Sequence, residues 1–406
     1  MFTTTFPTRL PQRLAVKLTI VGERSVRSGH PWIFSESIEK INSDGTSGDI
    51  AIIFSHTKNK VMGIGLYDPD SPIRIKMLHH EGSATIDADF FAEKIFNAFA
   101  LRAELLETDT NSYRLLHGEN DGFPGLIADV YADVLVVKLY SAIWFPYLEG
   151  ILEALLAVSN CTCVVLRLSR KLQSKSVSGF TDGQVLFGEL KKEVVPFKEH
   201  GVHFSAHVIK GHKTGYFLDH RHNRQQVGRY AHGKTVLDVF AYAGGFSVHA
   251  LARGATEVTS LDISEQALAL ALANGKLNTF SGKHTTLAGD AFVLLRHIIA
   301  NKKTYDIVVI DPPSFAKRQV EVDVAKKKYA QLAQLGAALT AQKGLLVLAS
   351  CSSRVSSDDF FEINETALKH ARRRYKQPSK TFHDVDHPTH FPEGAYLKCG
   401  YYRFLE

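Results

Sequence analysis

Five positions that could bind a ligand or do chemistry follow predicted buried strands in the second half of the chain. Gly244 follows the first of these strands, and Asp262, Asp290 and Asp311 stand at the ends of three more. Cys351 follows a fifth. Ligands of open α/β sheets bind at the carboxyl ends of the strands, so we expect these residues to share one edge of a sheet. Carboxylates there suit a ligand with hydroxyl groups or positive charge, and the thiol offers a nucleophile.

The stretch from Lys234 to Ser264 predicts the ligand in more detail. It predicts a strand, a tight turn at Ala243-Gly244-Gly245, a helix, and a second strand that ends on Asp262. Glycines let the backbone approach a ligand, and a carboxylate at that place can accept hydrogen bonds from both ribose hydroxyls. The stretch lacks the Gly-x-Gly-x-x-Gly pattern of dinucleotide sites and the Gly-Lys-Ser/Thr of phosphate loops. A ligand with a ribose but no phosphate fits better, and S-adenosylmethionine is the leading candidate; the alternative is an ordinary structural turn.

The composition is that of a globular protein. Of the 406 residues, 45% are hydrophobic and 22% are charged, and the formal net charge is +6. This balance excludes a disordered chain and permits a nucleic-acid partner. The four scattered cysteines fit a reducing compartment, and we find neither a secretory signal nor a membrane-length apolar run, so a cytoplasmic protein without membrane contact is expected. Cys161-x-Cys163 lacks the usual zinc spacing, and no metal site is predicted.

Glycine, proline and polar residues divide the chain into four predicted segments. Residues 1–12 are expected to be a disordered lead-in. Residues 13–85 hold short strands between turn residues and predict a small β-barrel. Residues 86–190 combine amphipathic helices with strands, which predicts a small α+β domain. Residues 191–406 alternate strands and helices, which predicts a mostly parallel α/β sheet with helices on both faces.

Six motifs occur in a characteristic order in the last of these segments: KTGYFLDHRHNR, LDVFAYAGGFSVHA, LDIS, GDAF, DPPSF and SCSS. In this order and spacing they resemble the class I methyltransferases that make 5-methylcytosine in large-subunit (23S) ribosomal RNA. The resemblance covers nearly the whole chain after residue 13. It implies an RNA-binding PUA β-barrel, a small α+β domain, and a Rossmann-like catalytic domain with a seven-stranded, mostly parallel sheet. It also implies S-adenosylmethionine as cofactor and large-subunit ribosomal RNA as partner, and it allows a homodimer.

The same resemblance assigns the cofactor-binding residues. It implies that Asp262 binds the ribose, that Ile263 flanks the adenine, and that Asp311 lies between the cofactor and the target base. The complete expected set is Lys213, Tyr216, Asp219, Arg221, Phe240, Tyr242, Gly244, Asp262, Ile263, Asp290 and Ala291.

Cys351 and Asp311 are the expected catalytic residues. Cytosine C5 is a poor nucleophile, but a thiolate that adds to C6 turns C5 into an enamine carbon that can accept a methyl group. A base must then remove the C5 proton before the thiolate leaves. Arg354 or Lys317 could favour the thiolate by lowering the pKa of the thiol. The candidates for the base are, in order, Asp311, His387 and Glu393.

RNA binding is expected to use positive charge and aromatic rings. Phosphate attracts lysine and arginine, and the target base must be unpaired or flipped out of a helix. The expected RNA-binding residues are Arg24, Arg27 and Lys317. The candidate stacking partners for the base are Phe315, Tyr216 and Phe217.

Two other functions fit the same motifs. Asp-Pro-Pro followed by an aromatic residue also suits enzymes that methylate guanine N7 or N2 or adenine N6, which need no cysteine. A catalytically inactive RNA-binding scaffold is the second alternative. Loss of activity on replacement of Cys351 would exclude the first, and cofactor binding would argue against the second.

Overall fold

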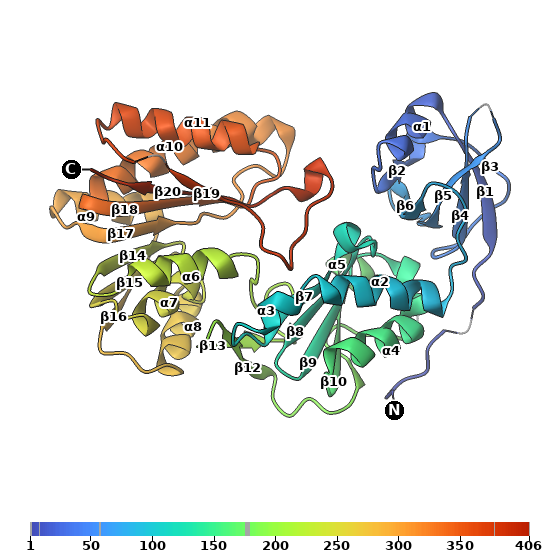
Figure 1. Cartoon of the computed structure of the whole chain (residues 1–406), viewed down its shortest axis with the longest axis horizontal. Coiled ribbons are helices and arrows are strands. Elements are labelled where there is room, and N and C mark those ends of the chain that lie inside the picture. Colours follow the sequence, from blue (N-terminus) through green and yellow to red (C-terminus); the bar gives the residue numbers. More distant parts are fainter. Residues whose placement is uncertain (1, 8, 57, 175–178, 377, 406) are drawn as a thin grey trace. The chain divides into compact units, whose positions relative to one another are not determined.

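The computed structural model describes residues 2–7, 9–56, 58–174, 179–376 and 378–405, which form two compact units (Figure 1). Unit 1 comprises Met1–Lys198, Ser205–Leu218 and Val385–Phe391. Unit 2 comprises Glu199–Phe204, Asp219–Asp384 and Pro392–Glu406. One short segment from the middle of the chain and one from near its end thus fold with the first unit.

The N-terminal part of unit 1 is a six-stranded sheet with the order β2-β6-β5-β4-β1-β3. Its buried face carries Leu14, Val16, Ala51 and Ile53, which alternate with more exposed residues as a half-buried sheet requires. One short helix, α1, begins after Thr19, whose side chain accepts a hydrogen bond from the backbone N–H of Gly22. The elements are β1 (Arg13–Leu18), α1 (Ile20–Arg27), β2 (Trp32–Phe34), η1 (Ser35–Ser37), β3 (Ile38–Ile41), β4 (Ile50–Phe54), β5 (Val61–Tyr67) and β6 (Ile73–His80).

The expected disordered lead-in is wrong for the residues that the structure describes. The backbone N–H of Thr3 donates to the carbonyl of Leu186 at 2.9 Å. Phe6 is 7% exposed, and its ring lies 5.1 Å from that of Phe2 and 5.8 Å from that of Phe180. Burial of Phe6 and the packing of Phe2 against it offset the entropy of ordering this segment. Residues 1 and 8 of the expected lead-in lie outside the described residues.

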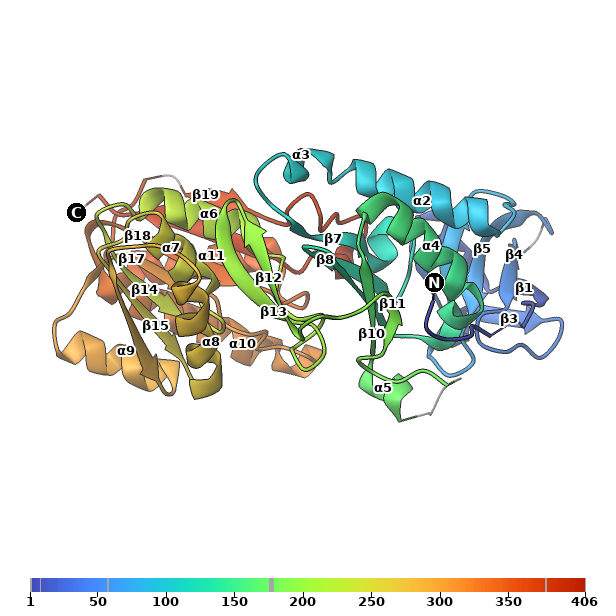
Figure 2. The ribbon, with the colours of Figure 1, turned by 90° about the horizontal axis from the view of Figure 1, so that it is seen from below.

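The second sheet of unit 1 has five strands in the order β11-β10-β9-β8-β7. Helices α2 and α4 lie side by side next to it (Figure 2). Phe91 of α2 and Leu148 and Leu152 of α4 share a buried core with Trp144 of η3. Its elements are α2 (Ala88–Ala100), α3 (Ala103–Leu106), β7 (Ser112–His117), η2 (Gly118–Asp121), β8 (Leu126–Tyr131), β9 (Val134–Leu139), η3 (Ala142–Tyr147), α4 (Leu148–Ser159), β10 (Cys163–Leu168), α5 (Arg170–Gln173) and β11 (Val185–Phe187). A two-stranded sheet of β12 (Val194–Glu199) and β13 (Val202–His207) follows along the chain.

Among the residues that the structure describes, one helical stretch is apolar and long enough to cross a membrane by length and composition. Residues 142–159 have a mean hydropathy of 1.4. Within unit 1, however, Trp144, Ile151 and Leu155 of this stretch are fully buried in the protein core. A core helix passes the same test, so the stretch is weak support for a membrane span.

Unit 2 contains a seven-stranded sheet with the order β16-β15-β14-β17-β18-β20-β19. Strands β14 to β18 pair in parallel, whereas β20 and β19 are antiparallel to their neighbours, so the predicted seven-stranded, mostly parallel sheet is confirmed. The strands are β14 (Thr235–Val239), β15 (Glu257–Asp262), β16 (Lys283–Ala288), β17 (Tyr305–Ile310), β18 (Thr340–Ser350), β19 (Ser379–Thr381) and β20 (Lys398–Arg403).

Helices cover both faces of this sheet (Figure 1). Side chains of α9, α10 and α11 share one buried cluster with Leu237 and Leu346, and those of α6 and α7 share another with Val236 and Val347. The helices are α6 (Arg221–Tyr230), α7 (Gly245–Ala252), α8 (Glu265–Lys276), α9 (Ala291–Ala300), η4 (Gln319–Glu321), α10 (Val322–Leu339), α11 (Ser357–His370) and η5 (Pro392–Gly394). The parallel strands therefore end at one common edge, which we call the carboxyl edge.

Candidate active site

The turn after β14 opens the carboxyl edge. Phe240, Tyr242 and Gly244 have φ angles of 65°, 46° and 76°, and left-handed backbone of this kind favours glycine. A Cβ atom at Gly244 would also lie 2.7 Å from Cβ of Ala271 in α8. The glycine is therefore needed for close packing of two helices, a reason that the sequence pattern alone did not suggest.

Asp262 ends β15 and organises the backbone around it. Its Oδ2 accepts from the backbone N–H of Tyr242 at 2.9 Å, and its Oδ1 accepts from that of Ser264 at 2.9 Å. The carboxylate is only partly buried, and each oxygen has a second lone pair for a further donor. Beside it, Ile263 is 75% exposed, which is unusual for an isoleucine and leaves an apolar surface for a flat ring.

Asp290 lies at the next strand end along the sheet. The strand pairing sets Ala288 of β16 opposite Asp262 of β15, and the N–H of Gly289 donates to the carbonyl of Asp262 at 3.0 Å. Asp290 caps α9, since its Oδ1 accepts from the N–H of Val293 at 3.0 Å. Ala291 follows and is 4% exposed.

Asp238 is a buried carboxyl group of the same region that the sequence did not single out as a site residue. Its Oδ2 accepts from the backbone N–H and the hydroxyl of Ser247 at 3.0 and 2.7 Å. Its Oδ1 has no hydrogen-bond partner among the described residues. Burial raises the pKa of Asp238 to about 7 despite those bonds, because the charged form is disfavoured away from water.

Asp311 follows β17 and lies beside a histidine. Nε2 of His220 is 3.4 Å from Oδ1 of Asp311, whose side chain is 23% exposed. His220 itself is 5% exposed. Burial has the largest single influence and lowers the pKa of His220, but the contact with Asp311 and the charges of Asp311 and Asp219 together outweigh it, so the net shift is upward.

The proton position on His220 follows from its other neighbour. The side-chain amide of Asn223 lies 3.1 Å from Nδ1 of His220, and Oδ1 of Asn223 accepts from the hydroxyls of Thr381 and Tyr401. The amide nitrogen therefore donates to Nδ1, which leaves the proton of a neutral imidazole on Nε2, facing Asp311. His220 and Asn223 were missed as site residues, although both stand in the KTGYFLDHRHNR motif.

Cys351 follows β18, the neighbour of β17. Its Sγ lies 3.8 Å from the carbonyl oxygen of Pro312, to which the thiol donates, so the cysteine is next to the Asp311-Pro312 corner. Cys351 is partly exposed, whereas the other three cysteines of the chain are buried. Within unit 2, the structure thus brings together the two expected catalytic residues.

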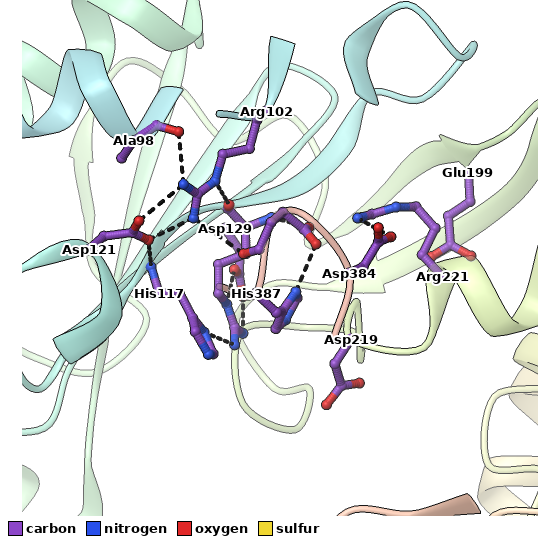
Figure 3. Close-up of polar contacts among 12 residues, drawn as sticks. Ala98, Arg102, His117, Asp121, Asp129, Glu199, Asp219, Arg221, Asp384 and His387 are labelled. Atoms are coloured by element: carbon purple, nitrogen blue, oxygen red, sulfur yellow. Dashed lines mark hydrogen bonds and ion pairs between the residues drawn. The ribbon is translucent and has the colours of Figure 1, made fainter. Parts of the chain in front are cut away.

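Two of the expected cofactor-binding residues of unit 2 form hydrogen bonds with other side chains of the protein. Arg221 is fully buried, and its guanidinium donates to Oδ2 of Asp384 at 2.8 Å (Figure 3). Asp219 is 8% exposed and accepts from the hydroxyl of Tyr396 at 3.0 Å. Their roles toward a cofactor stay predictions.

Lys213 and Tyr216 belong to unit 1. The ring of Tyr216 is 3% exposed and packs 5.1 Å from that of Phe197. The ammonium of Lys213 lies 4.9 Å from the ring of Phe217. Tyr216 is therefore a core residue of unit 1, and Phe217, which is less buried, is the more accessible stacking candidate of the two.

The other expected catalytic and RNA-binding residues occupy three kinds of environment. His387 of unit 1 is fully buried, with Nδ1 2.8 Å from Oδ1 of Asp386. Arg27 pairs with Glu23 at 2.7 Å, and Phe315 packs 5.2 Å from the ring of Tyr329. The exposed members of the set are Arg24, Arg27, Lys317, Arg354 and Glu393.

The carboxyl edge fits S-adenosylmethionine in its donor set. Asp262 offers acceptors for ribose hydroxyls, and Ile263 offers a surface for adenine. The carboxylates at this edge attract the positively charged sulfonium of this cofactor, whereas they would repel the phosphate of a nucleotide. Asp262, Ile263 and Asp290 are the residues that would hold the nucleoside.

Comparison with known proteins agrees with this geometry. Residues 113–395 match the family model of S-adenosylmethionine-dependent methyltransferases, and residues 16–80 match a PUA-like domain. A Deinococcus radiodurans protein named ribosomal RNA large subunit methyltransferase is 41% identical over 97% of this chain and 98% of its own length. A Shewanella frigidimarina protein named ribosomal RNA large subunit methyltransferase I is 35% identical over 95% and 98%.

Solved structures show the same fold. A Streptococcus mutans protein described as a SAM-dependent methyltransferase has a TM-score of 0.79 and 22% identity, with 96% of this chain and 99% of that chain covered. A methyltransferase crystallised with SAH has the same TM-score at 21% identity, over 97% and 100%. The predicted fold and cofactor are confirmed: this chain belongs to the family of S-adenosylmethionine-dependent methyltransferases, with a PUA-like domain at its N-terminus.

Proposed function

We propose that this protein methylates C5 of a cytosine in large-subunit ribosomal RNA, with Cys351 as the covalent nucleophile. The names of its relatives support the RNA substrate. The choice of atom rests on one observation: a partly exposed cysteine at the carboxyl edge, 3.8 Å from the carbonyl of Pro312 and thus next to Asp311. Methylation of an exocyclic amine or a ring nitrogen needs no thiol at that place.

Cys351 begins the reaction. Its thiolate forms a bond to C6 of the flipped cytosine, and the C5=C6 electrons become available at C5. When bound, S-adenosylmethionine supplies the electrophilic methyl group that C5 accepts. The carbon–sulfur bond to Cys351 breaks at the end, when loss of the C5 proton restores the double bond and returns the thiolate.

Asp311 is our assignment for the base that takes the C5 proton. Its carboxylate lies 3.4 Å from Nε2 of His220, a contact that orients it. The same carboxylate can instead hold the N3/N4 edge of the base while charge develops on addition. Either role places Asp311 against the target base.

The PUA-like domain is proposed to contribute RNA binding. Arg24 is exposed on α1, and a positive side chain there attracts phosphate without regard to sequence.

In unit 2, the ammonium of Lys328 lies 4.9 Å from the ring centre of Phe315, so an aromatic ring and a cation lie together after the Asp-Pro-Pro corner. Such a pair suits a stacked base next to a phosphate.

The test is methyl transfer from labelled S-adenosylmethionine to deproteinised large-subunit rRNA from cells that lack this protein, followed by nucleoside mass spectrometry. The proposal predicts 5-methylcytidine. A methylated guanine or adenine would replace the proposal with the nucleophile-free alternative. Cofactor binding without any product, on naked rRNA and on ribosomal precursors alike, would favour the scaffold.

A further inference from the structure

Lys398 is a buried lysine without a carboxylate partner. It is 1% exposed at the start of β20. Its Nζ donates to the carbonyl oxygens of Ser352 and Val355, each at 2.5 Å. No carboxylate pairs with it anywhere in the part of the chain that the structure describes. Removing an ammonium from water is costly when only neutral groups replace the water, so such a lysine calls for a functional explanation.

The position of Lys398 relates it to the candidate nucleophile. Antiparallel pairing of β20 with β18 sets Lys398 directly opposite Ser350, the residue before Cys351. Opposite residues of an antiparallel pair project from the same face of the sheet. The two carbonyls that Lys398 holds belong to the loop that follows Cys351. The ammonium therefore fixes this loop from within the protein.

The charges of the two side chains are coupled. Burial lowers the pKa of Lys398, and the negative charge of the Cys351 thiolate raises it in part, which leaves it at about 8. Lys398 is therefore mostly protonated at neutral pH. Because coupling is reciprocal, the ammonium favours the thiolate of Cys351 as much as the thiolate favours the ammonium.

We propose that Lys398 is the positioning residue of the nucleophile: it holds the loop of residues 351–355 and is the counter-ion of the Cys351 thiolate. This inference rests on the proposed function, in which Cys351 acts as a thiolate. The thiol proton passes to solvent, and the ion pair remains until sulfur bonds to C6 of the base. The ammonium acts through Cys351 and does not itself contact the reacting atoms.

The sequence-based candidates for this task are less suited to it. Arg354 and Lys317 are both exposed. Water and salt screen exposed charges, so their effect on a neighbouring thiol is small. Lys398 is distant from Cys351 in the sequence, and only the pairing of β18 with β20 brings it opposite Ser350, the residue before Cys351.

The test is the pH dependence of alkylation of Cys351 by iodoacetamide in the full-length protein, followed by peptide mass spectrometry. The buried cysteines will react slowly, since burial raises the pKa of both Cys161 and Cys163 to about 11. We expect the wild-type Cys351 to titrate below the ordinary thiol value of about 8.5. Lys398→Met should raise that midpoint and slow alkylation at pH 7 by about tenfold. Arg354→Gln, the matched loss of an exposed cation on the same loop, should change the rate less than about twofold.

Three outcomes decide the inference. An unchanged pH profile in a folded Lys398→Met variant would overturn it, because a merely structural lysine would not set the titration of the thiol. A Lys398→Arg variant that keeps the wild-type pH dependence of Cys351 alkylation would support the inference. If neither variant folds, the wild-type profile decides: a midpoint at or above about 8.5 overturns the ion pair, and a lower one supports it.

Alkylation is measured without RNA, so the inference and the proposed function can fail separately. A lowered thiol midpoint in wild type together with a methylated purine as product would refute the cytosine reaction and leave the ion pair intact. An ordinary thiol midpoint together with 5-methylcytidine would refute the ion pair alone.

Discussion

The charge cluster around Arg102 in unit 1 and the carboxyl edge of unit 2 bury charged groups in opposite ways. In unit 1, Arg102 is fully buried and donates to both oxygens of Asp121 at 3.0 and 2.6 Å, while its remaining N–H groups reach backbone carbonyls, including that of Ala98 (Figure 3). At the carboxyl edge of unit 2, Lys398 has carbonyl partners only, and Asp238 keeps one oxygen without a hydrogen bond within the described chain.

This difference distinguishes buried charges that stabilise the fold from buried charges that are typical of a functional site. A guanidinium that meets a carboxylate through two hydrogen bonds is satisfied, and it holds segments together. The backbone N–H of Arg114 donates to Asp386 at 2.9 Å, so the same charge cluster binds the segment Val385–Phe391 to unit 1. Buried groups that lack a full complement of partners are unfavourable for stability and are typical of functional sites. The cluster of unit 1 therefore uses buried charge for folding, whereas we interpret the buried charge at the carboxyl edge of unit 2 as part of the proposed active site.

Replacement of Cys351 should have the largest effect on activity. Cys351→Ala removes the only proposed nucleophile, so we expect methyl transfer to fall by on the order of 10³-fold or more, with cofactor affinity by calorimetry unchanged. Cys163→Ala, a buried cysteine in β10 of unit 1, is the control and should stay active. If Cys351→Ala kept its activity, Cys351 would not be the nucleophile, and the carboxyl edge would lose its proposed role in the chemistry.

Breaking the charge cluster of unit 1 should have the largest effect on stability. Arg102→Met leaves the buried carboxylate of Asp121 without its guanidinium, which typically lowers the free energy of unfolding by about 3–5 kcal/mol. Chemical denaturation measures this loss. Arg27→Met breaks an exposed pair with Glu23 and should cost less than about 1 kcal/mol. Similar losses in the two variants would mean that the buried cluster is not what holds unit 1.

Loss of His220 should impair chemistry and alter the pH dependence of stability. His220→Gln removes the group that orients Asp311, and we expect kcat to fall by about 10- to 100-fold with cofactor affinity unchanged. The pKa of His220 is raised in the folded protein, so its protonation adds stability below about pH 6.5, and this gain disappears as the pH rises through the folded value. Denaturation at pH 5.5 and 8.5 should show a larger advantage of wild type over the variant at pH 5.5. An equal or larger advantage at pH 8.5 would contradict the pairing.

The smallest effect is expected on RNA binding by the PUA-like domain. Arg24→Gln removes an exposed cation and should raise KM for RNA by about two- to threefold and lower the salt dependence of binding by about one phosphate contact. Arg27→Gln should do less, because Glu23 already offsets the charge of Arg27. A rise in KM for the cofactor in either variant would contradict an RNA role.

The sheet of unit 2 and its carboxyl edge followed from local patterns. Apolar runs that end in Asp262, Asp311 or Cys351 are short-range signals, and parallel pairing of β14 to β18 places those strand ends at one edge. The environments of Lys398 and His220 could not be predicted in this way. Lys398 meets the Cys351 loop only through an antiparallel strand pair, and His220 meets Asp311 only through tertiary packing. Long-range contacts of this kind leave no periodic trace in the sequence.

The polar partners of Arg221 and the packing of the N-terminus were hidden for the same reason. Arg221 forms an ion pair with Asp384, which is far away in the sequence, and the ring of Phe6 packs against that of Phe180. A buried arginine and a buried terminal phenylalanine look like exposed residues when only their neighbours in sequence are considered.

RNA in which cytosine is replaced by 5-fluorocytosine should trap a covalent bond between Cys351 and the target base. Fluorine at C5 cannot leave as a proton does, so the adduct formed after methyl transfer should persist. We expect a stable protein–RNA complex with wild type and S-adenosylmethionine, and a peptide adduct at Cys351 by mass spectrometry. Methylation of ordinary RNA to 5-methylcytidine without any trapped complex, or an adduct on another cysteine, would contradict it.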